Sequence, residues 1–214
     1  MRLGDIDEDE IVLASDSIDK EDKASKDQKE KSRPKAILSV VFDYLKVIVL
    51  GALIAFLISK FVIINAEVPT ESMVHTIEAG DRLIGLRLTY YFDSPERGDI
   101  VIFKCPKQGE DYNKLYVKRV IGLPGETVEI RAGAVWIKTA AGEEFMLQED
   151  YLNETPRPDA AVNNMSYPVP EGSYFMMGDN RNNSDDSRFW GTVTEDRVLA
   201  KVLFRYYPGF EVLK

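Results

Sequence analysis

The 214-residue sequence predicts a mainly β protein, in which one N-terminal membrane-spanning helix precedes an antiparallel β domain. Residues 47–59 carry no charge, and only Lys60 interrupts the apolar run to Ile64. Beyond residue 65, short β-branched and aromatic runs alternate with Gly and Pro turns, and no long helical period is present. We therefore expect three regions: a tail over 1–35, a transmembrane helix over 36–65 and a β-rich domain over 66–214.

The apolar region has the length of a membrane span. Eighteen helical residues at about 1.5 Å each reach roughly 27 Å, close to the thickness of a hydrocarbon core. Lys46 and Lys60 near its ends can extend their ammonium groups into the interfaces. The alternatives are a buried helix, which its nearly uniform apolarity disfavours, and a cleaved signal peptide. The run begins late for a signal peptide and lacks a small-x-small cleavage site.

The first 35 residues predict a disordered cytoplasmic tail, because they are rich in charge and poor in apolar side chains. Lysine and arginine gather just before the apolar region, whereas Glu67 and Glu71 follow it. Positive charge on the N-terminal flank orients such a helix with its N-terminus in the cytoplasm. The sequence thus predicts a single-pass protein of the cell membrane with an extracytoplasmic domain.

The composition of the whole chain excludes several classes of protein. The formal net charge of −9 disfavours nucleic-acid binding, which normally needs a basic face. Cys105 is the only cysteine, so no intrachain disulfide can form, and a packed thiol is favoured over a catalytic one.

The clearest predicted strands, bounded by turn residues, are 100–103, 116–120, 127–131, 135–138 and 198–206.

Ser72 is the leading candidate nucleophile, because it lies in a Pro-containing turn just after the apolar region. A serine hydroxyl needs a base to remove its proton. His75 is the only histidine, but a residue three positions away has no evident third group to orient it, and such bases normally come from distant segments. The Ser-x-x-Lys pattern of penicillin-binding enzymes would need a lysine at position 75.

Lys118 is the other candidate base. A lysine that acts near neutral pH must be desolvated, since burial disfavours the ammonium form. Strand alternation places Lys118 on one face with Tyr116 and Val120, and predicts that Arg119 points to solvent. Periodicity alone leaves open the alternative of an exposed strand lysine.

The segment Gly178–Gly191 is dense in small and polar residues and follows the apolar run 174–177. Asp and Asn side chains can fix such a segment as a rigid turn. Ser184 or Asp186 could then hold a base through a hydrogen bond. A calcium loop is the competing interpretation, but the carboxylate spacing departs from the EF-hand pattern.

These motifs, in this order, resemble those of bacterial type I signal peptidases, which are membrane-anchored Ser-Lys proteases. The matching segments are 69–73, 80–81, 97–101, 118–125 and 178–191. The resemblance implies a β-sheet catalytic domain of the signal-peptidase type, and removal of signal peptides from secreted preproteins through an acyl-enzyme. His75 departs from the family, which usually has Pro there. Lys118, rather than a histidine, is typical of the bacterial type.

The resemblance also implies individual roles. Ser72 would be the nucleophile and Lys118 the base, with an oxyanion hole formed by the Ser72 N–H and the Thr70 hydroxyl. Ser184 would orient Lys118, and Asp186 would support the last motif. Shallow pockets for small side chains one and three residues before the cut would be lined by Val68, Met73, Ile77 and Val117.

The implied partners are secretory preproteins, the lipid bilayer and a neighbouring secretion translocon, with no nucleic acid, metal or cofactor. Two alternatives stay open. One is a related Ser-Lys processing protease of narrower range, such as a pilin or conjugation maturase. The other is a membrane-tethered β-domain without catalysis.

Overall fold

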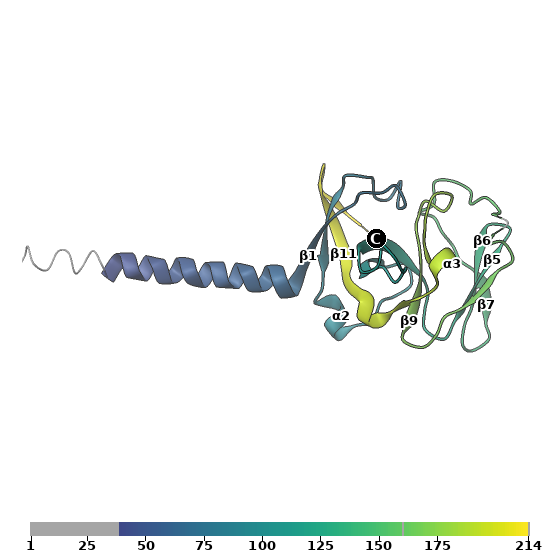
Figure 1. The fold of residues 1–214 in the computed structure, drawn as a ribbon, viewed down its shortest axis with the longest axis horizontal. Coiled ribbons are helices and arrows are strands. Elements are labelled where there is room, and N and C mark those ends of the chain that lie inside the picture. Colours follow the sequence, from purple (N-terminus) through teal and green to yellow (C-terminus); the bar gives the residue numbers. More distant parts are fainter. Residues whose placement is uncertain (1–38, 160, 214) are drawn as a thin grey trace, which may run out of the picture. The chain divides into compact units, whose positions relative to one another are not determined.

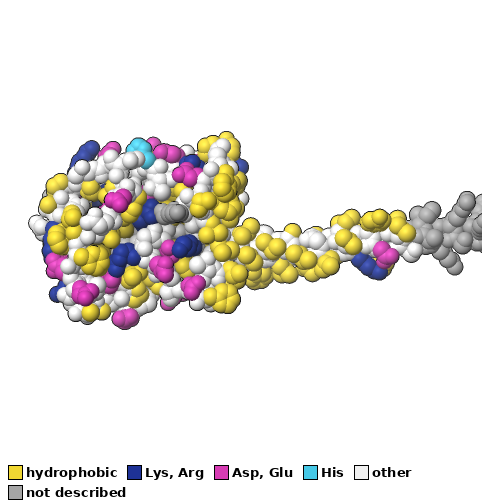
Figure 2. Space-filling model, turned by 180° about the vertical axis from the view of Figure 1, so that it is seen from behind, with side chains coloured by type: hydrophobic (Ala, Val, Ile, Leu, Met, Phe, Trp, Pro, Cys, Tyr) yellow, Lys and Arg dark blue, Asp and Glu magenta, His cyan; other side chains and the backbone are white. Residues whose placement is uncertain are grey.

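The computed structural model describes residues 39–159 and 161–213, so the predicted tail over 1–35 lies outside the described part of the chain. A helix spans Ser39–Val62 and is long and apolar enough to cross a membrane. Its last turn, η1 (Ile58–Val62), is a π-helix. Figure 2 shows mostly apolar side chains along its visible face. Near its start, Lys46 Nζ lies 3.0 Å from Asp43 Oδ1.

The helix ends three residues earlier than the expected limit at Asn65. Ile63 begins strand β1 (Ile63–Glu67), which pairs with β2 (Arg82–Leu86) in antiparallel register. The unbroken apolar run does not indicate where the helix ends and the strand begins, because a buried strand and an apolar helix share the same composition. The chain divides into two units between Phe56 and Leu57, and the strands of the described residues lie in the second unit.

The second unit consists of two antiparallel sheets and a few short helical turns (Figure 1). The larger sheet has the order β1-β2-β11-β3-β4-β9-β10, and β12 pairs with β11. Its remaining strands are β3 (Ile100–Lys104), β4 (Leu115–Gly122), β9 (Ser173–Met177), β10 (Val193–Thr194), β11 (Val198–Tyr207) and β12 (Glu211–Val212). The smaller sheet has the order β7-β6-β5-β8. Its strands are β5 (Thr127–Arg131), β6 (Ala134–Lys138), β7 (Glu144–Met146) and β8 (Ser166–Pro168).

Three helical turns complete the unit: α2 (Thr89–Phe92), α3 (Ser187–Trp190) and the 3₁₀ turn η2 (Glu195–Arg197). The mainly β fold class is thereby confirmed, and the five predicted strands correspond to β3, β4, β5, β6 and β11. Separate buried clusters of apolar side chains lie beneath β1–β2–β11, between β4 and the smaller sheet, and around β3–β9–β10. Burial of apolar side chains on both faces fixes the position of β4, which lies between β3 and β9.

Candidate active site

Ser72 lies in the connection between β1 and β2, which is closed at its base by backbone hydrogen bonds. Gly80 N donates to Val68 O at 2.7 Å, and within the connection Ile77 N donates to Met73 O at 2.9 Å. Met73 and Ile77 are completely buried in the core beside β1 and β2. These two apolar side chains therefore anchor the turn that carries Ser72.

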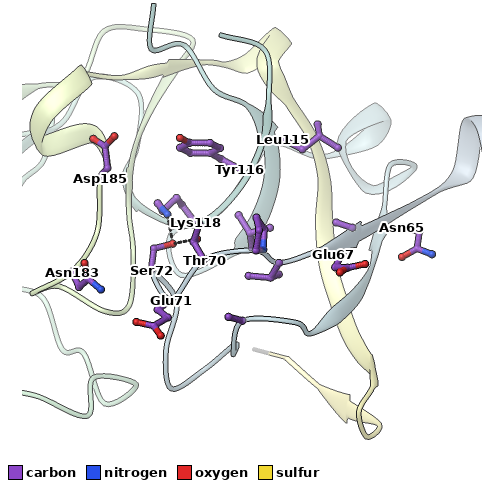
Figure 3. A pocket seen from close by; sticks show the side chains of 15 residues that line it. Asn65, Glu67, Thr70, Glu71, Ser72, Leu115, Tyr116, Lys118, Asn183 and Asp185 are labelled. Atoms are coloured by element: carbon purple, nitrogen blue, oxygen red, sulfur yellow. Dashed lines mark hydrogen bonds between the residues drawn. The ribbon is translucent and has the colours of Figure 1, made fainter. Parts of the chain in front are cut away.

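Ser72 meets Lys118, which comes from β4, across 46 residues of sequence. A 2.5 Å hydrogen bond joins Lys118 Nζ to Ser72 Oγ (Figure 3). Lys118 is 3% exposed and Ser72 is 9% exposed, so the pair is nearly removed from water. Thr70 Oγ1 lies 3.3 Å from Ser72 Oγ, and either hydroxyl can donate in this contact. The structure thus brings together three residues that the sequence analysis singled out.

Burial sets the electrostatics of Lys118. Desolvation lowers the pKa of the Lys118 amine from 10.5 to about 8, because the ammonium form loses its hydration. The negative charges of Asp186, Asp185 and Asp179 act in the opposite direction but do not outweigh burial. The Tyr116 ring, 5.5 Å from Nζ, covers another side of the amine. A substantial fraction of Lys118 is therefore neutral in weakly alkaline solution and able to accept a proton.

The segment after β9 donates hydrogen bonds to the backbone of the turn that carries Ser72. Asn180 N donates to Ser72 O at 3.1 Å, and Asn180 Nδ2 donates to Glu71 O at 3.0 Å. Gly178 packs so closely that a Cβ there would lie 2.3 Å from Ser72 O and 2.3 Å from Ser184 Oγ. Only glycine fits this position, since a side chain would displace the Ser72 backbone.

Asp186 makes the following turn rigid. It is completely buried and accepts hydrogen bonds from Gly178 N at 3.0 Å and from the Arg188 guanidinium at 2.8 and 2.9 Å. Its carboxylate also accepts from Arg188 N at the start of α3. Ser184 Oγ, in contrast, is buried and has no hydrogen-bond partner among the described residues. The hydrogen bond expected from Ser184 to Lys118 is therefore not formed in this structure.

The prediction that Arg119 points to solvent is wrong. Arg119 is 2% exposed and forms a two-pronged ion pair with Asp179, with Nε–Oδ1 at 2.9 Å and Nη2–Oδ2 at 2.7 Å. Its guanidinium also stacks over the Tyr151 ring at 4.0 Å. Strand alternation does place Arg119 opposite Lys118, but this face of β4 is covered as well. Asp179 accepts a 2.6 Å hydrogen bond from Thr76, so the pair is tied to the Ser72 turn.

Sequence reasoning missed this Arg119–Asp179–Thr76 connection. The signal that could have revealed it is the position of Asp179, directly after an apolar run and at the start of the polar segment. A carboxylate at such a place is expected to be buried and needs a cationic partner.

A groove of about 610 Å³ runs past the Ser72–Lys118 pair (Figure 3). It is lined by residues 65–72 together with Ala79, Leu115, Tyr116, Val117, Lys118, Asn183 and Asp185. Val68 and Val117 contribute to this lining, as the resemblance implies. Met73 and Ile77 are not among the residues that line this groove, and both are completely buried in the core beside it.

His75 is absent from the groove lining. Its side chain is 54% exposed, and Nδ1 lies 3.9 Å from Glu78 Oε1. The imidazole thus faces solvent beside another exposed residue. Within residues 39–159 and 161–213, no group of three or more His, Cys, Asp and Glu side chains is placed to hold a metal ion.

Comparisons with known proteins place this geometry in a family. The family model described as "Signal peptidase, peptidase S26" matches residues 41–207. A probable signal peptidase I-1 of Synechocystis sp. is 38% identical over 171 residues, which cover 78% of this chain and 83% of that protein. Signal peptidase IB of Staphylococcus aureus (strain COL) is 32% identical over 182 residues, covering 80% of this chain and 92% of that protein.

Among solved structures, a signal peptidase I from Enterococcus faecalis V583 is 34% identical, with a TM-score of 0.42, and covers 51% of this chain and 97% of that one. The family match extends over most of the chain, and both sequence relatives align over most of their own length. The chain that brings Ser72 and Lys118 together therefore belongs to the signal peptidase family, peptidase S26.

Proposed function

We propose that this protein removes signal peptides from secretory preproteins through an acyl-enzyme, with Ser72 as the nucleophile and Lys118 as the general base. The observation that carries the proposal is the 2.5 Å contact between a buried serine hydroxyl and a buried amine whose pKa is lowered to about 8. Membership of the family supports the reaction class, and the contact supports the assignment of roles.

In the acylation step, the neutral amine of Lys118 accepts the Ser72 proton while Oγ attacks the scissile carbonyl. The resulting ammonium then protonates the leaving amine of the mature protein, which departs as the acyl-enzyme forms. In the second step the same amine takes a proton from water, whose oxygen attacks the ester. Ser72 recovers its proton from Lys118, so both residues return to their starting states.

The tetrahedral intermediates carry negative charge on the former carbonyl oxygen. The Ser72 N–H and the Thr70 hydroxyl are the donors proposed to stabilise it. Thr70 Oγ1 already lies 3.3 Å from Ser72 Oγ and on the lining of the groove, which supports this role. Ser72 O is held by Asn180 N, so the backbone of the nucleophile is fixed before the substrate binds.

The groove supports recognition of an extended peptide with small side chains near the cut. Val68 is 3% exposed and forms part of the groove wall together with Val117 and Ala66. The apolar wall that they form next to Ser72 supports a preference for small apolar side chains one and three residues before the cut. Asp186 is proposed to stabilise the turn after β9 by accepting the hydrogen bond from Gly178 N. Ser184 is proposed to orient Lys118 through a contact that forms during the reaction.

The helix Ser39–Val62 is proposed to anchor the enzyme in the cell membrane, with its N-terminus in the cytoplasm and residues 66–214 on the other side. The length and apolarity of the helix support the anchor, and the basic flank before it supports the orientation. Anchoring would confine enzyme and signal peptide to one plane, near the translocon, and so raise their effective concentration.

Preprotein cleavage by purified full-length protein tests the proposal. Ser72→Ala and Lys118→Met are each expected to lower the rate at least about 10³-fold, because the nucleophile and its base act as one unit. Cys105→Ser is the matched control, a buried residue near Lys118 that no step uses. Turnover by Lys118→Met close to that of the wild type would refute the dyad. Absence of preprotein cleavage by the wild-type protein itself would instead favour a β-domain without catalysis.

A further inference from the structure

Lys107 and Asp185 form an ion pair beside the active-site groove. Lys107 Nζ lies 2.5 Å from Asp185 Oδ2, and the two residues are 78 positions apart in sequence. Lys107 belongs to the connection between β3 and β4, and Asp185 precedes α3. The two side chains are 42% and 43% exposed, so this pair remains in contact with solvent.

Asp185 also belongs to the wall of the groove that contains Lys118 (Figure 3). Its negative charge raises the pKa of Lys118, against the larger effect of burial. The same charge raises the pKa values of Cys105 and Tyr116, two further groups that lie around the amine. Asp185 and Lys118 therefore line the same groove, and the charge of Asp185 acts on the proposed base.

The carboxylates that act on Lys118 share a feature: each has a cationic partner. The pairs are Asp179 with Arg119, Asp186 with Arg188, and Asp185 with Lys107. The first two pairs are buried and hold the backbone of the site, as described above. The third differs, because it is half exposed and only one of its members, Asp185, lines the groove.

We propose that Lys107 is a positioning residue for the proposed Ser72–Lys118 reaction: by pairing with Asp185 it holds this carboxylate at the groove wall and offsets its negative charge beside the base amine. This inference rests on the proposed function. Lys107 touches no reacting atom in this scheme and acts through Asp185. The other titratable groups around Lys118 are Asp179, Asp186, Cys105 and Tyr116, and none of the four is itself replaced in the variants below. Cys105 and Tyr116 also feel the Asp185 charge, which raises the pKa of each.

The pH dependence of kcat/KM tests the proposal, because it reports the ionisation of groups in the free enzyme. In Lys107→Met, the uncompensated Asp185 charge favours the ammonium, so the rising limb is expected to move to higher pH. In Asp185→Asn, that negative charge is lost, so the limb moves to lower pH. Each shift is expected to be about a few tenths of a pH unit, as for charges partly exposed to solvent. In 1 M salt both shifts should shrink.

Opposite shifts separate this role from a structural one, since local damage would lower the rate in both variants without moving the limb in opposite directions. Lys114→Met is the matched control. Lys114 lies in the same connection and pairs with Asp111 at 2.9 Å, and neither residue lines the groove. The rising limb of the pH profile of Lys114→Met should stay where it is in the wild type. Two unmoved limbs, or two shifts in the same direction, would overturn the proposal. Loss of the limb itself would instead contradict Lys118 as the base.

Discussion

Arg119 and Asp179 form an ion pair that is almost completely removed from water. Breaking this pair tests whether it stabilises the turn that carries Ser72. Their side chains are 3% and 1% exposed. Replacing Arg119 with Met removes two hydrogen bonds to Asp179 and a third, of 2.8 Å, to Gly98 O. The Asp179 carboxylate would keep its hydrogen bond from Thr76 but lose its compensating charge.

Removing one member of a buried ion pair costs about 3–5 kcal/mol, because the other charge stays desolvated. We therefore expect Arg119→Met to lower the free energy of unfolding by about that amount. Exposed pairs contribute less than about 1 kcal/mol. Arg131 and Glu144, 2.5 Å apart and each 40% exposed, provide such a pair in the same domain. Arg131→Met is accordingly the matched control.

The assay is urea unfolding of the full-length protein in detergent micelles, followed by the circular dichroism of the β domain. Adding Asp179→Asn to Arg119→Met should recover about 1–3 kcal/mol, since it removes the uncompensated charge. Equal destabilisation by Arg119→Met and Arg131→Met, both below about 1 kcal/mol, would show that the Asp179 carboxylate is hydrated. The buried connection to the Ser72 turn would then be refuted.

Three further predictions concern the site itself. Because the pKa of Lys118 is lowered to about 8, kcat/KM should rise roughly tenfold from pH 6 to pH 7 and level off near pH 9; a rise that continues to pH 10.5 would contradict the lowered pKa. Gly178→Ala should cost about 1–3 kcal/mol of stability in urea unfolding and most of the activity, because its Cβ would overlap Ser72 O; wild-type turnover would argue against this contact. Thr70→Val should lower kcat about 100-fold with little change in KM, as measured by steady-state cleavage of a peptide; an effect confined to KM would assign Thr70 to substrate binding.

Local sequence patterns predicted the longer strands well and the ends of elements poorly. Strands β3 and β11 are rich in β-branched and aromatic residues, and both lie close to their predicted ranges. The predicted helix over 36–65 includes the first three residues of β1, because Ile63 and Ile64 continue the apolar run. What ends the helix is pairing with β2, a contact between segments that no local pattern shows. Strands of two or three residues, such as β10 and β12, carry too few side chains for a period to be visible.

In the site, motif order indicated Ser72 and Lys118, whereas the surroundings had to come from the structure. Alternation along β4 states which side chains share a face, but not whether that face is in water. For Arg119 the answer depended on Tyr151 and Asp179, which come from distant segments. The complete burial of Met73 and Ile77 likewise had to come from the structure, since position in a motif does not determine burial.

The contact between Asn180 N and Ser72 O has a consequence for biosynthesis. Ser72 and Lys118 are both made well before β9 and the Gly178–Asp186 turn, yet β9 pairs with β4 and the turn fixes the Ser72 backbone. A nascent chain that ends before Ser173 would contain both proposed catalytic groups without the scaffold that aligns them. We therefore expect proteolytic competence to arise only late in translation, and chains stalled on ribosomes before residue 173 to be inactive. Cleavage of a preprotein by such a stalled chain would disprove this order of assembly.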